Sequence, residues 1–119
     1  MATYPDMTLI SLLEDSVVAN FETNAFRNAV EDHLQLLKAG SGAQTVNAAD
    51  IDAVVFEGDL YGLFSKIGIE KRIRWTAMRM NGYTSPQEYA GDRTIFVIPD
   101  IDVMDRLAQA VASRQGLQH

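Results

Sequence analysis

Residues 77–100 read AMRMNGYTSPQEYAGDRTIFVIPD, and this stretch decides how the chain is expected to fold. A helical pattern ends at Asn81 and Gly82, because an Asn-Gly pair supplies the left-handed residue that closes a helix. A loop rich in turn residues follows. Residues 93–98 then carry the strongest strand signal in the chain, because they are rich in β-branched and aromatic residues and Pro99 ends the run.

The residues before this stretch predict a second strand and two helices. The run AVVF at 53–56 is β-prone, and we expect Val54–Phe56 to pair antiparallel with Ile95–Val97. Residues 60–67 and 73–80 place apolar side chains at helical spacing. Two strands alone are only marginally stable, so the helices are expected to cover one face of the pair.

The flanking regions predict further helices. Apolar residues recur at helical spacing over 9–17 and, more clearly, over 23–38, where the stripe consists of Phe26, Val30, Leu34 and Leu37. A last helix is expected from about Asp102 to Arg114. The sequence therefore predicts an α+β protein, with N-terminal helices, a βααβ unit and a C-terminal helix. Its expected parts are a helical region at 1–40, a linker at 41–52, the βααβ domain at 53–100, and a C-terminal helix and tail at 101–119.

The composition excludes several classes of function. The 119 residues include no cysteine, which removes disulfide scaffolds, zinc fingers and thiol catalysis. The net charge of −6 argues against a nucleic-acid binder. No run approaches the about 18 apolar residues of a membrane span, and the N-terminus lacks the basic start of a secretion signal. We expect neither nucleic acid nor membrane as a partner.

The sequence also contains no recognisable motif for catalysis or for cofactor binding. No serine lies in the Gly-x-Ser-x-Gly motif of a nucleophile elbow. The glycines are not followed by the Gly-Lys-Ser/Thr of a phosphate-binding loop. The aspartates near 50 and 100 lack the glycine and glutamate of a calcium loop, and helix capping accounts for Asp100 and Asp102. His33 is best interpreted as a boundary residue on its helix. We therefore expect no enzyme, no cofactor and no metal.

Two stretches resemble a LysM module. Residues 58–69, GDLYGLFSKIGI, are similar to its opening, and residues 77–100 are similar to its second half. The positions that match in the second half are Asn81, Gly82, Ser85, Pro86, Gly91, Ile98 and Pro99. The resemblance implies a βααβ fold with the helices on one face of the sheet. It also implies a sugar-binding alternative, in which the chain holds N-acetylglucosamine polymers of peptidoglycan through two loops. The loop residues in that alternative are Gly58, Asp59, Tyr61, Asn81, Gly82 and Tyr83.

The chain departs from sugar-binding LysM modules at two places. The threonine that usually follows Gly-Asp is missing after Asp59. The link between the two helices is longer and carries Lys71, Arg72 and Arg74. Small baseplate and tail proteins of contractile-tailed phages are similar over more of the chain, since they join a LysM-like unit to helices. This second resemblance implies a non-catalytic structural subunit, present in several copies in a virion that is assembled in the bacterial cytoplasm. A regulatory or toxin-neutralising adaptor is a third reading that the sequence leaves open.

The charge distribution suggests where such a subunit would touch its neighbours. Residues 1–59 carry 2 basic and 10 acidic side chains, whereas residues 60–80 carry 5 basic and 1 acidic. Buried tryptophan and arginine side chains are enriched at the energetic centres of interfaces. We therefore expect an acidic partner surface to meet the inserted basic turn, and the N-terminal helix to supply a second contact. The expected interface residues are Arg72, Arg74, Trp75, Arg79 and Phe26.

Overall fold

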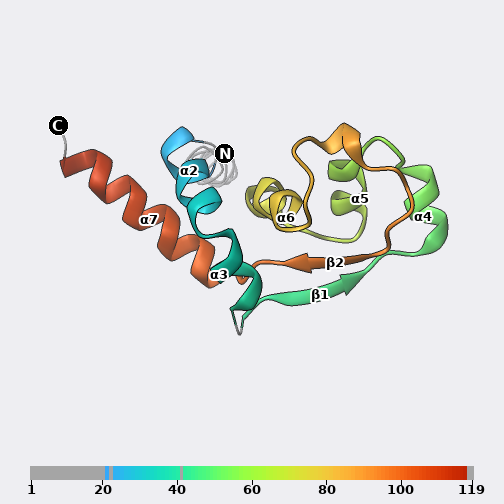
Figure 1. The fold of residues 1–119 in the computed structure, drawn as a ribbon, viewed down its shortest axis with the longest axis horizontal. Helices are drawn as coiled ribbons and strands as arrows, with labels where there is room; N and C mark the ends of the chain where they lie inside the picture. The colour runs from blue at the N-terminus through green and yellow to red at the C-terminus, as the bar shows by residue number, and fades with distance from the viewer. Residues whose placement is uncertain (1–20, 22, 41, 118–119) are drawn as a thin grey trace, which may run out of the picture.

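The computed structural model describes residues 21, 23–40 and 42–117 and confirms the α+β class. Its described elements are α2 (Asn24–Asp32), α3 (Leu34–Ala39), β1 (Gln44–Asn47), α4 (Asp50–Val55), α5 (Leu60–Lys66), η1 (Lys71–Ile73), α6 (Arg74–Met80), η2 (Pro86–Glu88), β2 (Ile95–Ile98) and α7 (Ile101–Leu117). Figure 1 shows α5 and α6 on one side of the strand pair, with α2 and α7 beyond α6. The helix expected over 9–17 lies outside the described residues.

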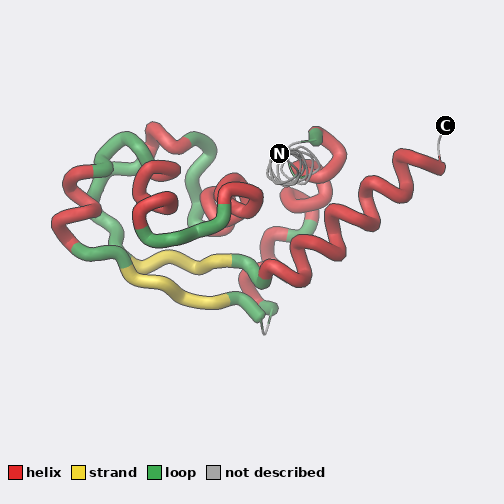
Figure 2. The backbone as a smooth tube through the Cα atoms, turned by 180° about the vertical axis from the view of Figure 1, so that it is seen from behind, coloured by secondary structure: helices red, strands yellow, loops and turns green. Residues whose placement is uncertain are grey.

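The strand pair is antiparallel, but the partner of β2 is not the predicted one. β1 lies beside β2, as Figure 2 shows. The register sets Gln44 opposite Ile98 and Asn47 opposite Ile95. Strand β1 therefore lies in the segment 41–52, which the sequence predicted to be a linker. The backbone of Ala48 extends the ladder by donating to the Thr94 carbonyl at 2.7 Å.

The strand predicted over 53–56 is wrong, because residues 50–55 form helix α4. The β-branched residues of this run made it look like a strand. Two aspartates, Asp50 and Asp52, occupy the first turn, where negative charge is favourable to the helix dipole. The unit between the strands thus contains α4 in addition to the two helices that the sequence predicted.

The helix predicted over 23–38 is interrupted at His33. The backbone there, at φ −120° and ψ 17°, leaves the helical region, and α3 begins at Leu34. The Nδ1 atom of His33 lies 2.7 Å from the carbonyl oxygen of Ala29, within hydrogen-bond distance. The predicted apolar stripe still faces inward, since Phe26 and Val30 are fully buried and Leu34 and Leu37 are half-buried against the core.

One hydrophobic core joins the sheet unit to the flanking helices. Phe96 of β2 contacts Phe64 of α5 edge-on, with ring centroids 5.4 Å apart, and lies 6.0 Å from the ring of Tyr89. Met104 of α7 is fully buried in the same cluster as Phe26. Burial of apolar side chains such as these is the main favourable contribution to folding, at about 25 cal/mol per Å² of apolar surface. The core thereby fixes η1 and α6 between α2 and α5, where the candidate site forms.

Candidate protein interface at a basic aromatic pocket

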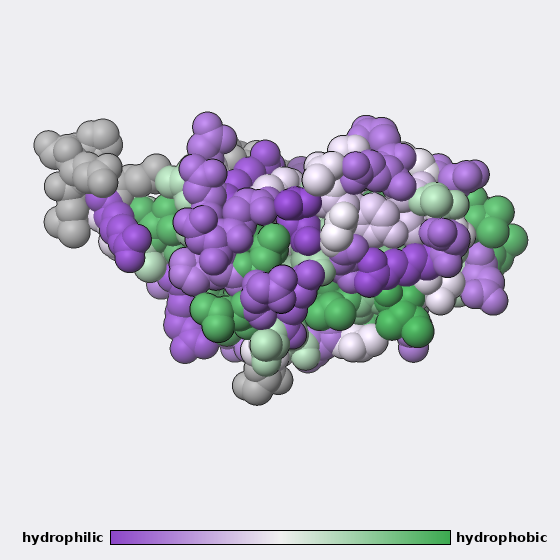
Figure 3. All heavy atoms as spheres, in the orientation of Figure 1, coloured by the Kyte–Doolittle hydropathy of each residue, from purple (hydrophilic) through white to green (hydrophobic). Residues whose placement is uncertain are grey.

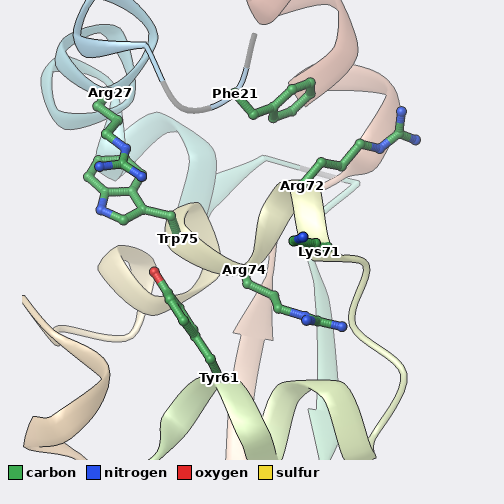
Figure 4. Close-up of a pocket in the computed structure, with 7 residues that line it drawn as sticks. All are labelled: Phe21, Arg27, Tyr61, Lys71, Arg72, Arg74 and Trp75. Atoms are coloured by element: carbon green, nitrogen blue, oxygen red, sulfur yellow. The ribbon is translucent and has the colours of Figure 1, made fainter. Parts of the chain in front are cut away.

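Side chains from three parts of the chain line a pocket of about 150 Å³. We call it the basic aromatic pocket, and its residues are Phe21, Arg27, Tyr61, Lys71, Arg72, Arg74 and Trp75. Figure 4 shows Trp75 and Arg74 on the α6 side, Tyr61 rising from α5, and Arg27 reaching down from α2. Four of the seven side chains are cationic, three are aromatic, and none is acidic. The pocket is therefore suited to an anionic group beside an apolar one.

The turn η1 and the start of α6 position the cations. Ile73 is 4% exposed and Ala77 is fully buried, so these residues anchor the segment to the core. Lys71 is left exposed, and Arg74 and Trp75 are left half-exposed, on the side that faces the pocket. Cations near the N-terminus of a helix are opposed by its dipole, at a cost of about 0.3–1 kcal/mol each. Such a local conflict is expected where residues serve function rather than folding.

The cations of the pocket differ in the ion pairs and hydrogen bonds that they form within the protein. Arg72 forms ion pairs with Glu70 at 3.0 Å and with Asp105 of α7 at 3.1 Å. The Nε of Arg74 donates to the Ile69 carbonyl at 2.9 Å. Within the described ranges no carboxylate forms an ion pair with Lys71 or Arg74. These two side chains keep charge and donors available to a partner.

Arg27 completes the wall opposite α5. Its guanidinium lies 5.0 Å from the centroid of the Trp75 ring, in a cation–π contact. Its Nε is buried without a hydrogen-bond partner among the residues that the structure describes. A buried donor without a partner is uncommon in folded proteins.

Two expected interface residues are used inside the fold instead. Arg79 holds Glu31 of α2 with two contacts, Nε to Oε1 at 2.5 Å and Nη2 to Oε2 at 3.0 Å, and it also donates to the Tyr83 carbonyl. The hydrogen bond from Arg79 lowers the pKa of Glu31, and the same bond raises the pKa of Arg79. Phe26 is fully buried in the core. The expectation that Phe26 contacts a partner is therefore wrong, and Arg79 joins α6 to α2.

The residues of the sugar-binding alternative mostly maintain the fold. Asp59 begins α5 by accepting from the Gly62 amide at 2.9 Å, and Asn81 is 7% exposed with both ends of its amide bonded to backbone. Tyr83 packs edge-on against Tyr89. The remaining three do not form a polar groove either: Gly58 and Gly82 are turn residues with positive φ, and Tyr61 belongs to the basic aromatic pocket.

Sequence reasoning missed Arg27 and Phe21 as members of the pocket. Both lie far from the basic turn in the chain and reach it only through the packing of α2 against α6. Their sequence neighbourhood carries no signal of this contact. Arg72, Arg74 and Trp75 do lie together, as the local run of basic residues predicted.

The comparisons with known proteins return no match to this chain, whether among family models, curated proteins or solved structures. Among the described residues, no helix combines the length and apolar character needed to cross a membrane. No cluster of three potential metal ligands occurs in that part of the chain either.

Proposed function

We propose that this protein is a structural, non-catalytic subunit of a phage tail or baseplate that joins neighbouring virion proteins through its LysM-like unit and flanking helices. The observation that carries the proposal is the basic aromatic pocket. Its cations sit against the dipole of α6, and Lys71 and Arg74 lack an ion-pair partner in the described part of the chain. A protein surface with acidic and apolar side chains would complement it.

The pocket has the composition of an interface centre rather than of a reaction site. Tryptophan, tyrosine and arginine dominate the residues whose loss weakens protein complexes most. Rim charges such as Lys71 set orientation and the rate of association. The antiparallel pair with α5 and α6 on one side retains part of the fold that the resemblance to LysM-like tail proteins implies, whereas helix α4 is an addition that the resemblance does not imply. The retained part supports the proposal to that extent.

The test is incorporation of charge-reversed chains into particles. Lys71→Glu with Arg74→Glu reverses the two cations that the protein leaves unpaired, whereas Arg72 is left intact because its ion pairs tie η1 to α7. The matched control is Arg106→Glu with Arg114→Glu, which changes the net charge equally at two exposed positions on α7. Particles are purified from cells that express the tail gene cluster, and mass spectrometry measures the chain relative to another tail protein.

We expect the K71E/R74E chain to fold, as judged by circular dichroism, and to be incorporated about tenfold less than wild type, which corresponds to about 1.4 kcal/mol of binding free energy. The R106E/R114E control should be incorporated normally. Normal incorporation of K71E/R74E would contradict the proposal. Retention of the chain on purified peptidoglycan, lost on Tyr83→Ala, would instead favour the sugar-binding alternative.

A further inference from the structure

Helix α4 exposes an apolar face that the fold does not use. Ile51, Val54 and Val55 are 69%, 65% and 65% exposed and lie at i, i+3 and i+4, so they share one side of the helix. Ala53, on the opposite side, is buried. We call the three exposed residues the α4 face. Figure 3 shows hydrophobic side chains gathered at the end of the molecule where α4 lies. Contiguous exposed apolar side chains of this kind mark interaction sites.

The chain segment that carries the α4 face is acidic. Residues 39–65 contain four carboxylates and no lysine or arginine. Asp50 and Glu57 are exposed at the two ends of the helix, and neither forms an ion pair within the described ranges. The α4 face therefore offers what the basic aromatic pocket lacks, namely apolar side chains flanked by negative charge.

The pocket matches this face in size as well as in charge. A cavity of about 150 Å³ holds a group the size of benzene. The pocket therefore has room for one branched side chain of the α4 face. The carboxylates of Asp50 and Glu57 would then meet Lys71 and Arg74 at the rim.

A single chain cannot make this contact with itself. In Figure 1, α5 and α6 lie between α4 and α2, and α2 supplies the Arg27 wall of the pocket. Pairing of two α4 faces with each other would bring like charges together. When a contact between two different patches of identical chains is not reciprocated within the same pair, it is heterologous, and it propagates into rings or filaments rather than stopping at a dimer.

We propose that the α4 face of one copy docks in the basic aromatic pocket of a second copy, so that the chains associate head to tail. This inference rests on the proposed function, and it names a second copy of the chain as the acidic partner of the pocket. It also gives the subunit a means to form the multi-copy arrangement that a tail requires.

The test is a charge exchange on the full-length chain, measured by sedimentation velocity across a concentration series. One variant carries Asp50→Lys and Glu57→Lys, and the other carries Lys71→Glu and Arg74→Glu. Each variant alone presents like charges at the contact, whereas their mixture restores opposite charges at every junction. Circular dichroism and thermal melting verify that both variants are folded.

We expect the wild-type mass to rise with concentration beyond that of a dimer. Each variant alone should stay at 13.2 kDa, with a dissociation constant raised by about tenfold or more, which is about 1.4 kcal/mol. The equimolar mixture should associate again. A wild-type chain that stays monomeric or stops at a dimer overturns the inference, as does a folded mixture that stays monomeric.

A second pair of variants tests the apolar part of the contact. Val54→Ser removes a central side chain of the α4 face, and Leu36→Ser removes a comparably exposed side chain on α3. Only Val54→Ser should weaken self-association, and equal effects of the two substitutions would overturn the inference.

Particle incorporation separates this inference from the proposed function. If D50K/E57K is incorporated normally while K71E/R74E is not, the pocket binds a different subunit; the self-association is then overturned while the proposed function stands. Normal incorporation of K71E/R74E overturns the proposed function itself.

Discussion

The most informative single substitution is Asn81→Ala, because Asn81 holds the outer edge of β2. Its Nδ2 donates to the Val97 carbonyl at 2.8 Å and to the Ala77 carbonyl at 2.6 Å, and its Oδ1 accepts from the Val97 amide at 2.9 Å. Since β1 occupies the other edge, with Thr45 opposite Val97, the Asn81 amide takes the place of a third strand at this position.

The magnitude follows from counting the backbone groups that lose their partner. Alanine at 81 leaves the amide and the carbonyl of Val97 without this partner, at a position that is half-buried. Each unsatisfied buried group costs about 1–3 kcal/mol, and water at the half-buried edge recovers part of that cost. We expect a loss of about 2–4 kcal/mol in the free energy of unfolding. For a chain of this length that lowers Tm by roughly 10 °C.

The assay is urea unfolding followed by circular dichroism and by Trp75 fluorescence. The two probes should give coincident transitions if unfolding is two-state. A loss below about 0.5 kcal/mol, the range of ordinary surface substitutions, would refute the interpretation of Asn81 as the edge partner of β2.

Asn81→Asp provides a control with a distinct pH signature. The carboxylate keeps an acceptor for the Val97 amide but faces the carbonyl oxygens of Ala77 and Val97, so its pKa in the folded state should be raised. A group with a raised folded pKa stabilises the fold below its unfolded pKa, and that stability is lost as the pH rises through the folded value. The variant should therefore approach wild-type stability below about pH 4 and fall behind it toward pH 7.

Three further predictions concern local contacts. Glu31→Gln should cost about 0.5–1 kcal/mol at pH 7, the range of a partly exposed pair. Because Arg79 lowers the pKa of Glu31, the wild-type advantage should vanish as the pH falls below about 4 in urea titrations. Tyr89→Phe should lower the free energy of unfolding by about 1 kcal/mol in the same assay, because the hydrogen bond from the Tyr89 hydroxyl to the Arg93 carbonyl is lost. Since burial raises the pKa of Tyr89, the stability of the wild-type chain should fall above about pH 10. Gly91→Ala should lower Tm more than Gly58→Ala: both have φ near +75°, but an added Cβ lies 3.0 Å from the Ala53 carbonyl only at Gly91.

The parts of the fold that the sequence predicted are those with a long or strong local pattern. The run at 93–98 predicted β2, and the apolar stripes predicted α5, α6 and α7 to within a few residues. Strand β1 was missed because QTVN is short and only Val46, opposite Phe96, is apolar. The AVVF run was misread because its exposed valines belong to a helix face, and a four-residue run does not distinguish the two periods.

The candidate site was predictable only where its residues are neighbours in the chain. The basic turn with Trp75 predicted a charged aromatic surface, and the structure places those side chains in one pocket. Arg79 looked equivalent to Arg74 in sequence, but tertiary packing gives it Glu31 as a partner. Arg27 enters the site by the same packing of α2 on α6, which no local pattern encodes.

The central claim is that the basic aromatic pocket is covered by protein in the assembled state. Hydroxyl-radical oxidation of Trp75, measured by mass spectrometry on the dilute free chain and on purified tail particles, tests it most directly. Trp75 and Tyr83 are both half-buried aromatic side chains, and only Trp75 lines the pocket. We predict a severalfold fall in Trp75 oxidation in particles, with Tyr83 unchanged. Equal oxidation of Trp75 in the free chain and in particles would contradict the account.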